Sequence, residues 1–157
     1  MMIAVKYRRL TDTRMEPFAD SWAELVAALS VHRETADKFD GGLWSPVVPT
    51  DDGPRKRCNA AVAAVSAIVL DVDDGQPLDD FTAGLGGEWI AYSTWNHTPE
   101  APRYHVVMRL SEPVPVAEWR DTYERGNGHR ADWLPAASHA YFLPEHAPGA
   151  PWFVAHS

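Results

Sequence analysis

The spacing of apolar and polar positions predicts a chain of short helices and several strands. Residues 2–9 alternate as a first strand does, and residues 11–17 are polar enough to indicate a turn region. Ser21 can cap a helix in which Glu24 takes the third helical position of a capping box. The apolar residues of that helix fall on one face: Trp22, Leu25, Val26 and Leu29.

Glycine and proline punctuate the rest of the chain. They are frequent enough in the segment 40–58 to predict mostly loop. The clearest buried strand follows at 65–72, and its apolar character is nearly continuous. Further strands are predicted at 88–94, 103–110 and 138–143, and short helices at 78–84 and 116–125.

Short turns between the predicted strands indicate an antiparallel or mixed sheet and therefore an α/β (α+β) fold. The length of 157 residues suits one domain, and 45% hydrophobic residues is typical of a globular chain. We expect the core to span about 1–144. The remainder, 145–157, is rich in Pro, Gly and His and is expected to be a tail.

Cysteine content and apolar run length bear on where the protein resides. The longest apolar run, Ala60–Leu70, is too short to cross a bilayer, so no membrane partner is expected. Cys58 is the only cysteine, which excludes an intrachain disulfide and favours a reducing compartment. We therefore expect a cytoplasmic protein.

The charge balance limits the nucleic-acid surfaces that the chain can present. Lys plus Arg number 14 and Asp plus Glu number 22, which gives a net charge of −8. Such a chain repels polyphosphate at long range, but a local groove or a metal-bridged nucleotide remains compatible with it. There are two basic clusters, which more often mean solvated surface charge than a binding site. They comprise Lys6, Arg8, Arg9 and Arg14, and Arg55, Lys56 and Arg57.

Two aspartates stand at the end of the predicted buried strand. Asp71 and Asp73 are two residues apart, so their side chains point to the same face of the sheet. Carboxylates held together in this way repel each other, and a hard divalent cation such as Mg²⁺ relieves that repulsion. The alternative is that Asp73, Asp74 and Gly75 simply form an acidic turn.

A second group of polar residues surrounds the turn between the strands at 88–94 and 103–110. Arg103 and His105 project from one face of the later strand, and both side chains can bind phosphate. On its own, His105 is more typical of a satisfied sheet histidine, and His97 in the turn is expected to be exposed. Asp132 lies in a later loop, where a lone Asp is usually a cap or a surface charge.

Together these blocks resemble the archaeo-eukaryotic primase superfamily, and most closely the primase-polymerase domains of phages and plasmids. Asp71-Val-Asp73 closing a strand, His105 on a later strand and a downstream Asp132 are similar to that superfamily's three motifs. The surrounding order agrees over about 22–144. It comprises Lys38, Gly41-Gly42-Leu-Trp44, Asn59, Ser66–Gly75, Tyr92–Arg103, Leu110–Val114 and Phe142-Leu-Pro144.

The resemblance implies an RRM-like core beside an N-terminal α/β unit. It also implies template-dependent nucleotidyl transfer by a DNA primase or polymerase in the replication of a mobile element. Asp71, Asp73 and Asp132 would hold Mg²⁺ or Mn²⁺, with His105 as the fourth catalytic residue. Nucleotide contacts would come from Arg103 and His105, and also from Ser93, Thr94 and Lys38.

The partners implied are nucleoside triphosphates and a single-stranded DNA template, with a separate helicase or replication protein as a further candidate. The implied setting is a bacterial or phage-infected cell. The chain departs from the family pattern where 115–131 is short and where Ser138-His139-Ala140 replaces an expected Arg.

Two other functions stay open at this stage. A catalytically weakened primase fold would bind nucleotide, single-stranded nucleic acid or a partner protein. A haloacid-dehalogenase-type phosphohydrolase would use the strand end at Leu70–Gly75, but a second Asp there precedes the glycine and no Thr follows it.

Overall fold

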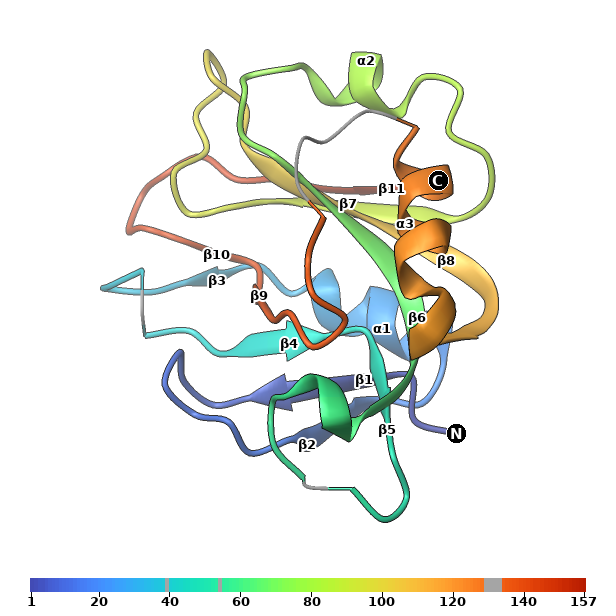
Figure 1. The fold of residues 1–157 in the computed structure, drawn as a ribbon. Coiled ribbons are helices and arrows are strands. Elements are labelled where there is room, and N and C mark those ends of the chain that lie inside the picture. The colour runs from blue at the N-terminus through green and yellow to red at the C-terminus, as the bar shows by residue number, and fades with distance from the viewer. Residues whose placement is uncertain (39, 54, 129–133) are drawn as a thin grey trace.

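The computed structural model describes residues 1–38, 40–53, 55–128 and 134–157. The chain folds into three sheets and a few short helices (Figure 1). The strands are β1 Ala4–Tyr7, β2 Glu16–Ala19, β3 Arg33–Glu34, β4 Leu43–Ser45, β5 Val47–Pro49, β6 Val62–Val72, β7 Trp89–Ser93, β8 Tyr104–Pro115, β9 Tyr141–Phe142, β10 Glu145–His146 and β11 Val154–His156. The α-helices are α1 Trp22–Leu29, α2 Leu78–Thr82 and α3 Trp119–Asn127, and short 3₁₀ turns span Asn59–Ala61 and Val116–Glu118.

The largest sheet has five strands in the order β11-β7-β8-β6-β5, and every neighbouring pair is antiparallel. The long strands β6 and β8 occupy its centre because their apolar runs are buried from both faces. A compact α+β fold with antiparallel pairing is therefore confirmed. The finer expectation of an RRM-like core stays a prediction.

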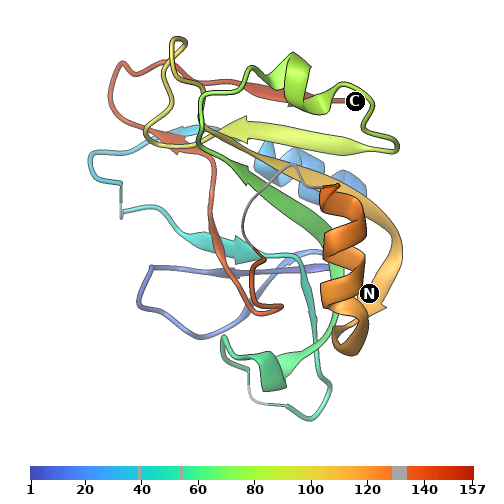
Figure 2. The same cartoon turned by 45° about the horizontal axis from the view of Figure 1, so that its top comes forward.

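The two faces of this sheet pack against different elements. Ile68 and Leu70 of β6 belong to the core that also contains Trp119 and Tyr123 of α3. The intervening positions of β6 face the opposite core, which contains α1 and the strands β1 and β4. Figure 2 shows α3 in front of the sheet and α1 behind it. After the register shift between Val65 and Ala67, period-two alternation therefore places Asp71 on the α1 side together with Ala67 and Val69.

The second sheet has the order β2-β1-β4-β9, and parts of it lie in segments predicted as loop or turn. The segment 40–58 is mostly loop, as predicted, but it also contains β4 of this sheet and β5 of the large sheet. Trp44 in β4 is fully buried between strands, so tertiary packing outweighs the nearby prolines and glycines. The predicted turn at 11–17 likewise contains the start of β2, which pairs with β1.

The expected tail after Pro144 is also wrong. β10 pairs in parallel with β3, and β11 adds an edge strand to β7. The pairing registers join Glu145 to Arg33 and Val154 to Tyr92. Proline and glycine in this segment shape the connections between short strands, and they do not prevent pairing at the sheet edges.

The helices agree better with the sequence pattern. Ser21 caps α1 by accepting a hydrogen bond from the Glu24 N–H at 3.2 Å. The Glu24 carboxylate in turn accepts from the Asp20 N–H at 2.9 Å, one residue earlier than a capping box requires. In the part of the chain that the structure describes, no helix has both the length and the apolar character needed to span a bilayer.

Candidate functional site

Three polar side chains lie side by side across the centre of the large sheet. Asp71 on β6 is directly opposite His105 on β8, and His105 is directly opposite Tyr92 on β7. Because all three occupy matched positions in the register, their side chains project from the same face. The sheet thus brings together residues that are separated by 13 to 34 positions in sequence.

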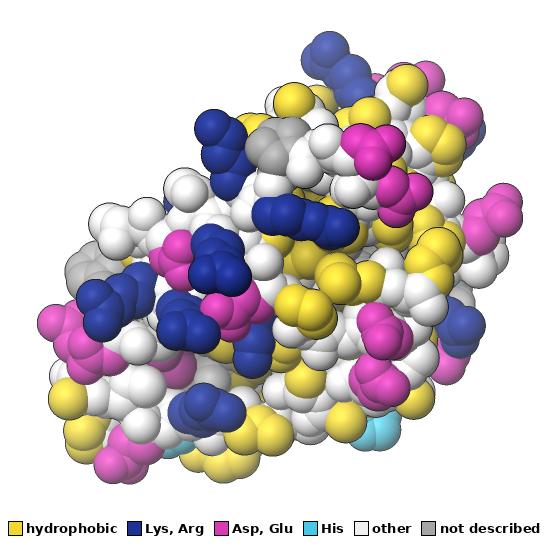
Figure 3. All heavy atoms as spheres, turned by 90° about the horizontal axis from the view of Figure 1, so that it is seen from below, with side chains coloured by type: hydrophobic (Ala, Val, Ile, Leu, Met, Phe, Trp, Pro, Cys, Tyr) yellow, Lys and Arg dark blue, Asp and Glu magenta, His cyan; other side chains and the backbone are white. Residues whose placement is uncertain are grey.

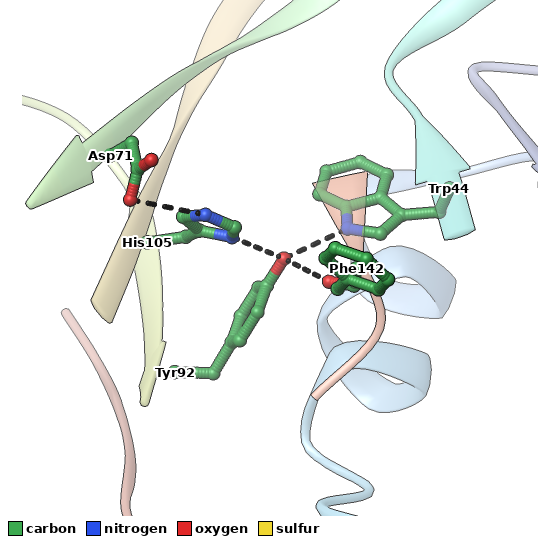
Figure 4. Close-up of polar contacts among 5 residues, drawn as sticks. All are labelled: Trp44, Asp71, Tyr92, His105 and Phe142. Carbon is green, nitrogen blue, oxygen red and sulfur yellow. Dashed lines mark hydrogen bonds and ion pairs between the residues drawn. The ribbon is translucent and has the colours of Figure 1, made fainter. Parts of the chain in front are cut away.

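A chain of polar contacts links these residues to the second sheet (Figure 4). His105 Nε2 lies 3.3 Å from Asp71 Oδ1, and His105 Nδ1 lies 3.0 Å from the Tyr92 hydroxyl. Trp44 Nε1 donates to the same hydroxyl at 2.9 Å, and the hydroxyl donates to the Phe142 carbonyl at 3.0 Å. The contacts fix the imidazole ring between a carboxylate and a buried phenol.

The proton count in this network constrains His105. The Tyr92 hydroxyl has one proton, which it donates to the Phe142 carbonyl, so it accepts from both Trp44 and His105. A proton on His105 Nδ1 is therefore donated to the Tyr92 hydroxyl, while Nε2 faces the Asp71 carboxylate.

Asp71 is half-exposed and remains ionised in this setting. Its partial burial tends to raise the pKa of the carboxyl, but the hydrogen bond and charge of His105 more than offset that effect. The charges of His139 and Arg103 act in the same direction, so the pKa of Asp71 lies below its ordinary value. The side chain is therefore an anionic oxygen donor at neutral pH.

A cavity of about 220 Å³ opens beside this network. It collects most of the side chains that the sequence nominates: Lys38, Asp71, Asp73, Thr94, Arg103 and His105. The predicted common face of Asp71, Asp73, Arg103 and His105 is thus present. Lys38 comes from the segment after β3, far from the other residues in sequence, and its presence gives the pocket a second cation.

The turn between β7 and β8 positions Arg103. The Thr94 N–H donates to the Arg103 carbonyl at 3.0 Å, and the Arg103 N–H donates to His97 Nδ1 at 3.2 Å. His97 is buried and packs edge-on against Phe153, which corrects the expectation that it is exposed. Burial lowers the pKa of His97, so its Nδ1 is free of a proton and available to accept.

Ser93 does not belong to the pocket. It is fully buried, and its hydroxyl contacts His32 Nε2 at 3.1 Å and accepts from the Phe153 N–H at 2.9 Å. Tyr92 and Thr94 alternate with it along the chain and line the pocket instead. The nucleotide contact that the resemblance implies for Ser93 therefore has no support from its position.

His105 is more deeply packed than an open phosphate site requires. Only 7% of the residue is exposed, and its ring lies edge-on to Tyr92 and Tyr141. Replacing His105 is therefore expected to destabilise the fold. Removing the ring would leave a cavity and take away a hydrogen-bond partner of Tyr92.

The strand end shows which aspartate serves the turn. Asp74 Oδ1 accepts from the Gln76 N–H at 3.1 Å, and Gly75 has a positive φ of 85°. Turn chemistry therefore accounts for Asp74 and Gly75. Asp73 is exposed and faces the pocket, so the acidic turn does not account for its position.

The two pocket carboxylates, Asp71 and Asp73, meet part of what a hard divalent cation requires. Mg²⁺ is commonly held by one or two carboxylates together with water and substrate phosphates, and Asp71 and Asp73 meet that requirement. Among the described residues, no three His, Cys, Asp or Glu side chains are arranged to hold a metal ion. Asp132, the third ligand that the resemblance implies, lies outside the described residues.

Sequence reasoning missed several residues that line the pocket. These are Tyr92, Trp95, Asn96, Phe142, Leu143 and Glu145. Alternation along the strand would have found Tyr92, since it lies two residues before Thr94. The residues from 142 to 145 carried no such signal, because the pocket includes them only through the pairing of β9 and β10 with distant strands.

A second cavity, of about 560 Å³, is also lined by Asp71 and His105. It extends to Arg57, Ser138 and His139. Arg57 also bonds to the Leu10 carbonyl at 3.1 Å and lies over the Tyr7 ring, so its guanidinium is fixed. Two cavities therefore open onto the site, and both are lined by the Asp71 carboxylate and the His105 imidazole.

The two basic clusters of the sequence form one surface patch. Backbone contacts join the β1–β2 hairpin to the loop before β6, since Arg14 pairs with Lys56 and the Arg57 N–H donates to Thr13 at 2.7 Å. Figure 3 shows Lys and Arg side chains gathered on one part of this face, with acidic side chains among them. We call these residues the basic patch: Lys6, Arg8, Arg9, Arg14, Arg55, Lys56 and Arg57.

Comparison with known proteins adds no relative from which function could be transferred. The chain matches no protein-family model, no curated protein and no solved structure.

Proposed function

We propose that this protein is a nucleotidyltransferase of the primase-polymerase kind, which joins nucleotides on a single-stranded DNA template. The observation that carries this proposal is the composition of one pocket. Two aspartates from a strand end lie in it beside His105, Arg103 and Lys38. Acidic oxygen donors next to several phosphate-binding cations are the parts that phosphoryl chemistry requires.

The pocket would take the nucleoside triphosphate. Arg103 offers a planar fork for phosphate oxygens, and Lys38 offers a second positive charge. His105 holds the Asp71 carboxylate through Nε2 while Tyr92 holds the ring through Nδ1, so little reorganisation of this carboxylate is needed when charge develops on the phosphates. Thr94 is a further hydroxyl partner at the same edge.

Asp71 and Asp73 would hold Mg²⁺ or Mn²⁺. Such an ion supplies activation of the primer hydroxyl and neutralisation of the triphosphate charge. Asp71 also orients His105 through the contact at Nε2, so the same carboxylate serves the cation and the imidazole. The hydrogen bond and charge of His105 keep the pKa of this half-exposed aspartate below its ordinary value.

The template strand would run through the second cavity onto the basic patch. That cavity begins at Asp71 and His105 and reaches Arg57, which belongs to the patch. Seven of the chain's 14 Lys and Arg residues lie in the patch, so positive charge is concentrated there in a protein of net charge −8. Phosphate contacts of this kind position a strand without reading its sequence.

Extension of a labelled primer on a DNA template with Mn²⁺ tests the proposal. We expect incorporation by the wild-type protein and a loss of at least a hundredfold in Asp71→Asn and Asp73→Asn, since each removes an anionic ligand. Asp79→Asn is the matched control, because Asp79 lies in the first turn of α2 and does not line the pocket.

Other outcomes separate the remaining functions. If the wild-type protein binds nucleotide but does not incorporate it into the primer, it is a binding module, and the enzymatic assignment is wrong. Release of inorganic phosphate without primer extension, lost in Asp71→Asn, would identify a phosphohydrolase. Equal incorporation by Asp71→Asn and the wild type would remove the pocket from the reaction.

A further inference from the structure

Glu145 is a buried acidic residue of the nucleotide pocket to which the proposed reaction assigns no role. It lies at the start of β10, where its backbone is paired in register with that of Arg33 in β3, and only 3% of the residue is exposed. It lines the cavity that also contains Lys38, Asp71 and Arg103. A third carboxyl at a site for polyphosphate requires a separate explanation, because phosphates repel it.

The carboxyl has hydrogen-bonding capacity that the protein does not use. Glu145 Oε1 is buried and has no hydrogen-bond partner among the described residues. Buried polar atoms are nearly always paired, and an unpaired one costs about 1–3 kcal/mol. The unpaired oxygen therefore points to a ligand.

The fold holds this carboxyl in one position. A Cβ at Gly41 would overlap Glu145 Oε2, so the backbone at 41 packs directly on the carboxyl. Burial raises the pKa of Glu145 to about 7, hydrogen bonding with Thr35 opposes this rise, and the charges of Asp40 and Asp37 add to it. A hydrogen-bond donor from a ligand would relieve the same burial cost.

The other groups in the pocket decide which part of a nucleotide the carboxyl can contact. Lys38 and Arg103 suit the phosphates, whereas Glu145 can approach only a neutral part that carries N–H or O–H groups. The sugar and the base are the parts that meet this condition. The apolar surfaces of Trp95 and Phe142 line the same cavity and suit such a part.

We propose that Glu145 is a specificity-determining residue that accepts a hydrogen bond from a sugar hydroxyl or a base N–H of the bound nucleotide. This inference rests on the proposed function of the pocket. A site built around such a bond rejects ligands that lack the donor, because the buried acceptor is then left unpaired. Glu145 would thus select among nucleotides, while Asp71 and Asp73 would serve the reaction.

Calorimetric titration with matched nucleotides tests this inference. The series comprises ATP, dATP and 2′,3′-dideoxy-ATP for the sugar, and ATP, GTP, CTP and UTP for the base. We expect the wild type to prefer ligands with the required donor by at least tenfold, and Glu145→Met, which has a similar shape and no acceptor, to lose that preference. The matched control is Glu112→Gln, which removes an exposed carboxylate of β8 outside the pocket.

The outcomes distinguish this inference from the proposal on which it rests. If the wild type binds no nucleotide, both fail. If it binds nucleotides but shows no preference, or if Glu145→Met keeps the wild-type preference, only the role of Glu145 fails. Glu145→Gln provides a second variant, since it removes the charge but keeps an acceptor oxygen. A uniform loss of affinity for every nucleotide in both variants would also overturn the role.

Discussion

The hydroxyl of Tyr92 connects the two main sheets at the site. It contacts Trp44 from β4, the Phe142 carbonyl from β9 and His105 from β8. Burial raises the pKa of Tyr92 far above its ordinary value, which keeps the hydroxyl protonated at all physiological pH values. His105 therefore contacts a neutral, fixed phenol through Nδ1 and the Asp71 carboxylate through Nε2.

Glu145 gives a pH-dependent prediction at the same scale. Its folded pKa of about 7 exceeds the ordinary value of 4.5, so the folded protein binds more protons than the unfolded chain between these values. The resulting stabilisation is fully present below about pH 4.5 and is lost as the pH rises through 7. The slope is at most about 1.4 kcal/mol per pH unit.

Urea unfolding at pH 5, 6, 7 and 8 measures this effect. We expect the free energy of unfolding of the wild type, minus that of Glu145→Gln, to fall as the pH rises. Burial lowers the pKa of His32 to about 4, which has the opposite effect on stability, but His32 is present in both proteins and cancels in the difference. A pH-independent difference would contradict the raised pKa.

Among the elements, the long central strands were predictable, and several of the short strands were not. The segments that became β6, β7 and β8 carry enough consecutive apolar residues to indicate burial before any partner is known. β4, β5 and β10 have two or three residues each, and they become strands only because a partner pairs with them. The local hydrophobic pattern of the sequence does not show which distant strands will pair.

The same distinction explains the outcome at the site. Alternation along a strand was sufficient to bring Asp71, Asp73, Arg103 and His105 to one face, but the one-residue step to Ser93 crosses to the other face. Glu145 follows a proline in a segment expected to be a tail, so nothing in the sequence distinguished it from a surface acid. Only the parallel pairing of β10 with β3 buries it.

The edge strand β11 gives a prediction at the element scale. It covers β7, and Phe153 just before it packs against His97 and Tyr104. Removing residues 152–157 would expose the edge of β7 and take away those ring contacts. We expect this truncation to destabilise the fold by about 3 kcal/mol, the scale of a lost Phe side chain, and to promote aggregation.

Thermal unfolding and light scattering check that expectation. Removal of Met1 alone is the control, because this residue is 79% exposed at the other end of the chain. An unchanged melting temperature after removal of 152–157 would mean that β11 does not contribute to the sheet in solution.

At the scale of the whole molecule, the distribution of charge matters more than its total. The basic patch contains exposed residues such as Arg14 and Lys56, while the protein as a whole is acidic. Local acids reduce the field of the patch, since Arg8 pairs with Glu16 at 2.8 Å. We therefore expect single-stranded DNA to bind weakly and with strong salt dependence.

Fluorescence anisotropy with a labelled oligonucleotide at several KCl concentrations tests the patch. The Arg14→Gln, Lys56→Gln double variant should bind more weakly at low salt. Its slope of log affinity against log salt should be smaller by about 1.4, which corresponds to two lost phosphate contacts. Arg120→Gln is the control, because Arg120 pairs with Glu124 on α3. Identical slopes for all three proteins would mean that the patch is solvated surface charge.

The last three strands each join a different sheet: β9 pairs with β4, β10 with β3, and β11 with β7. During synthesis, residues from 141 onward emerge after nearly all of their partners, at roughly 5–20 residues per second. The pocket walls at Phe142 and Glu145 therefore do not exist while most of the chain is already outside the ribosome. A nascent chain that has not yet reached residue 141 therefore lacks these two walls of the pocket, whatever the state of its central sheet.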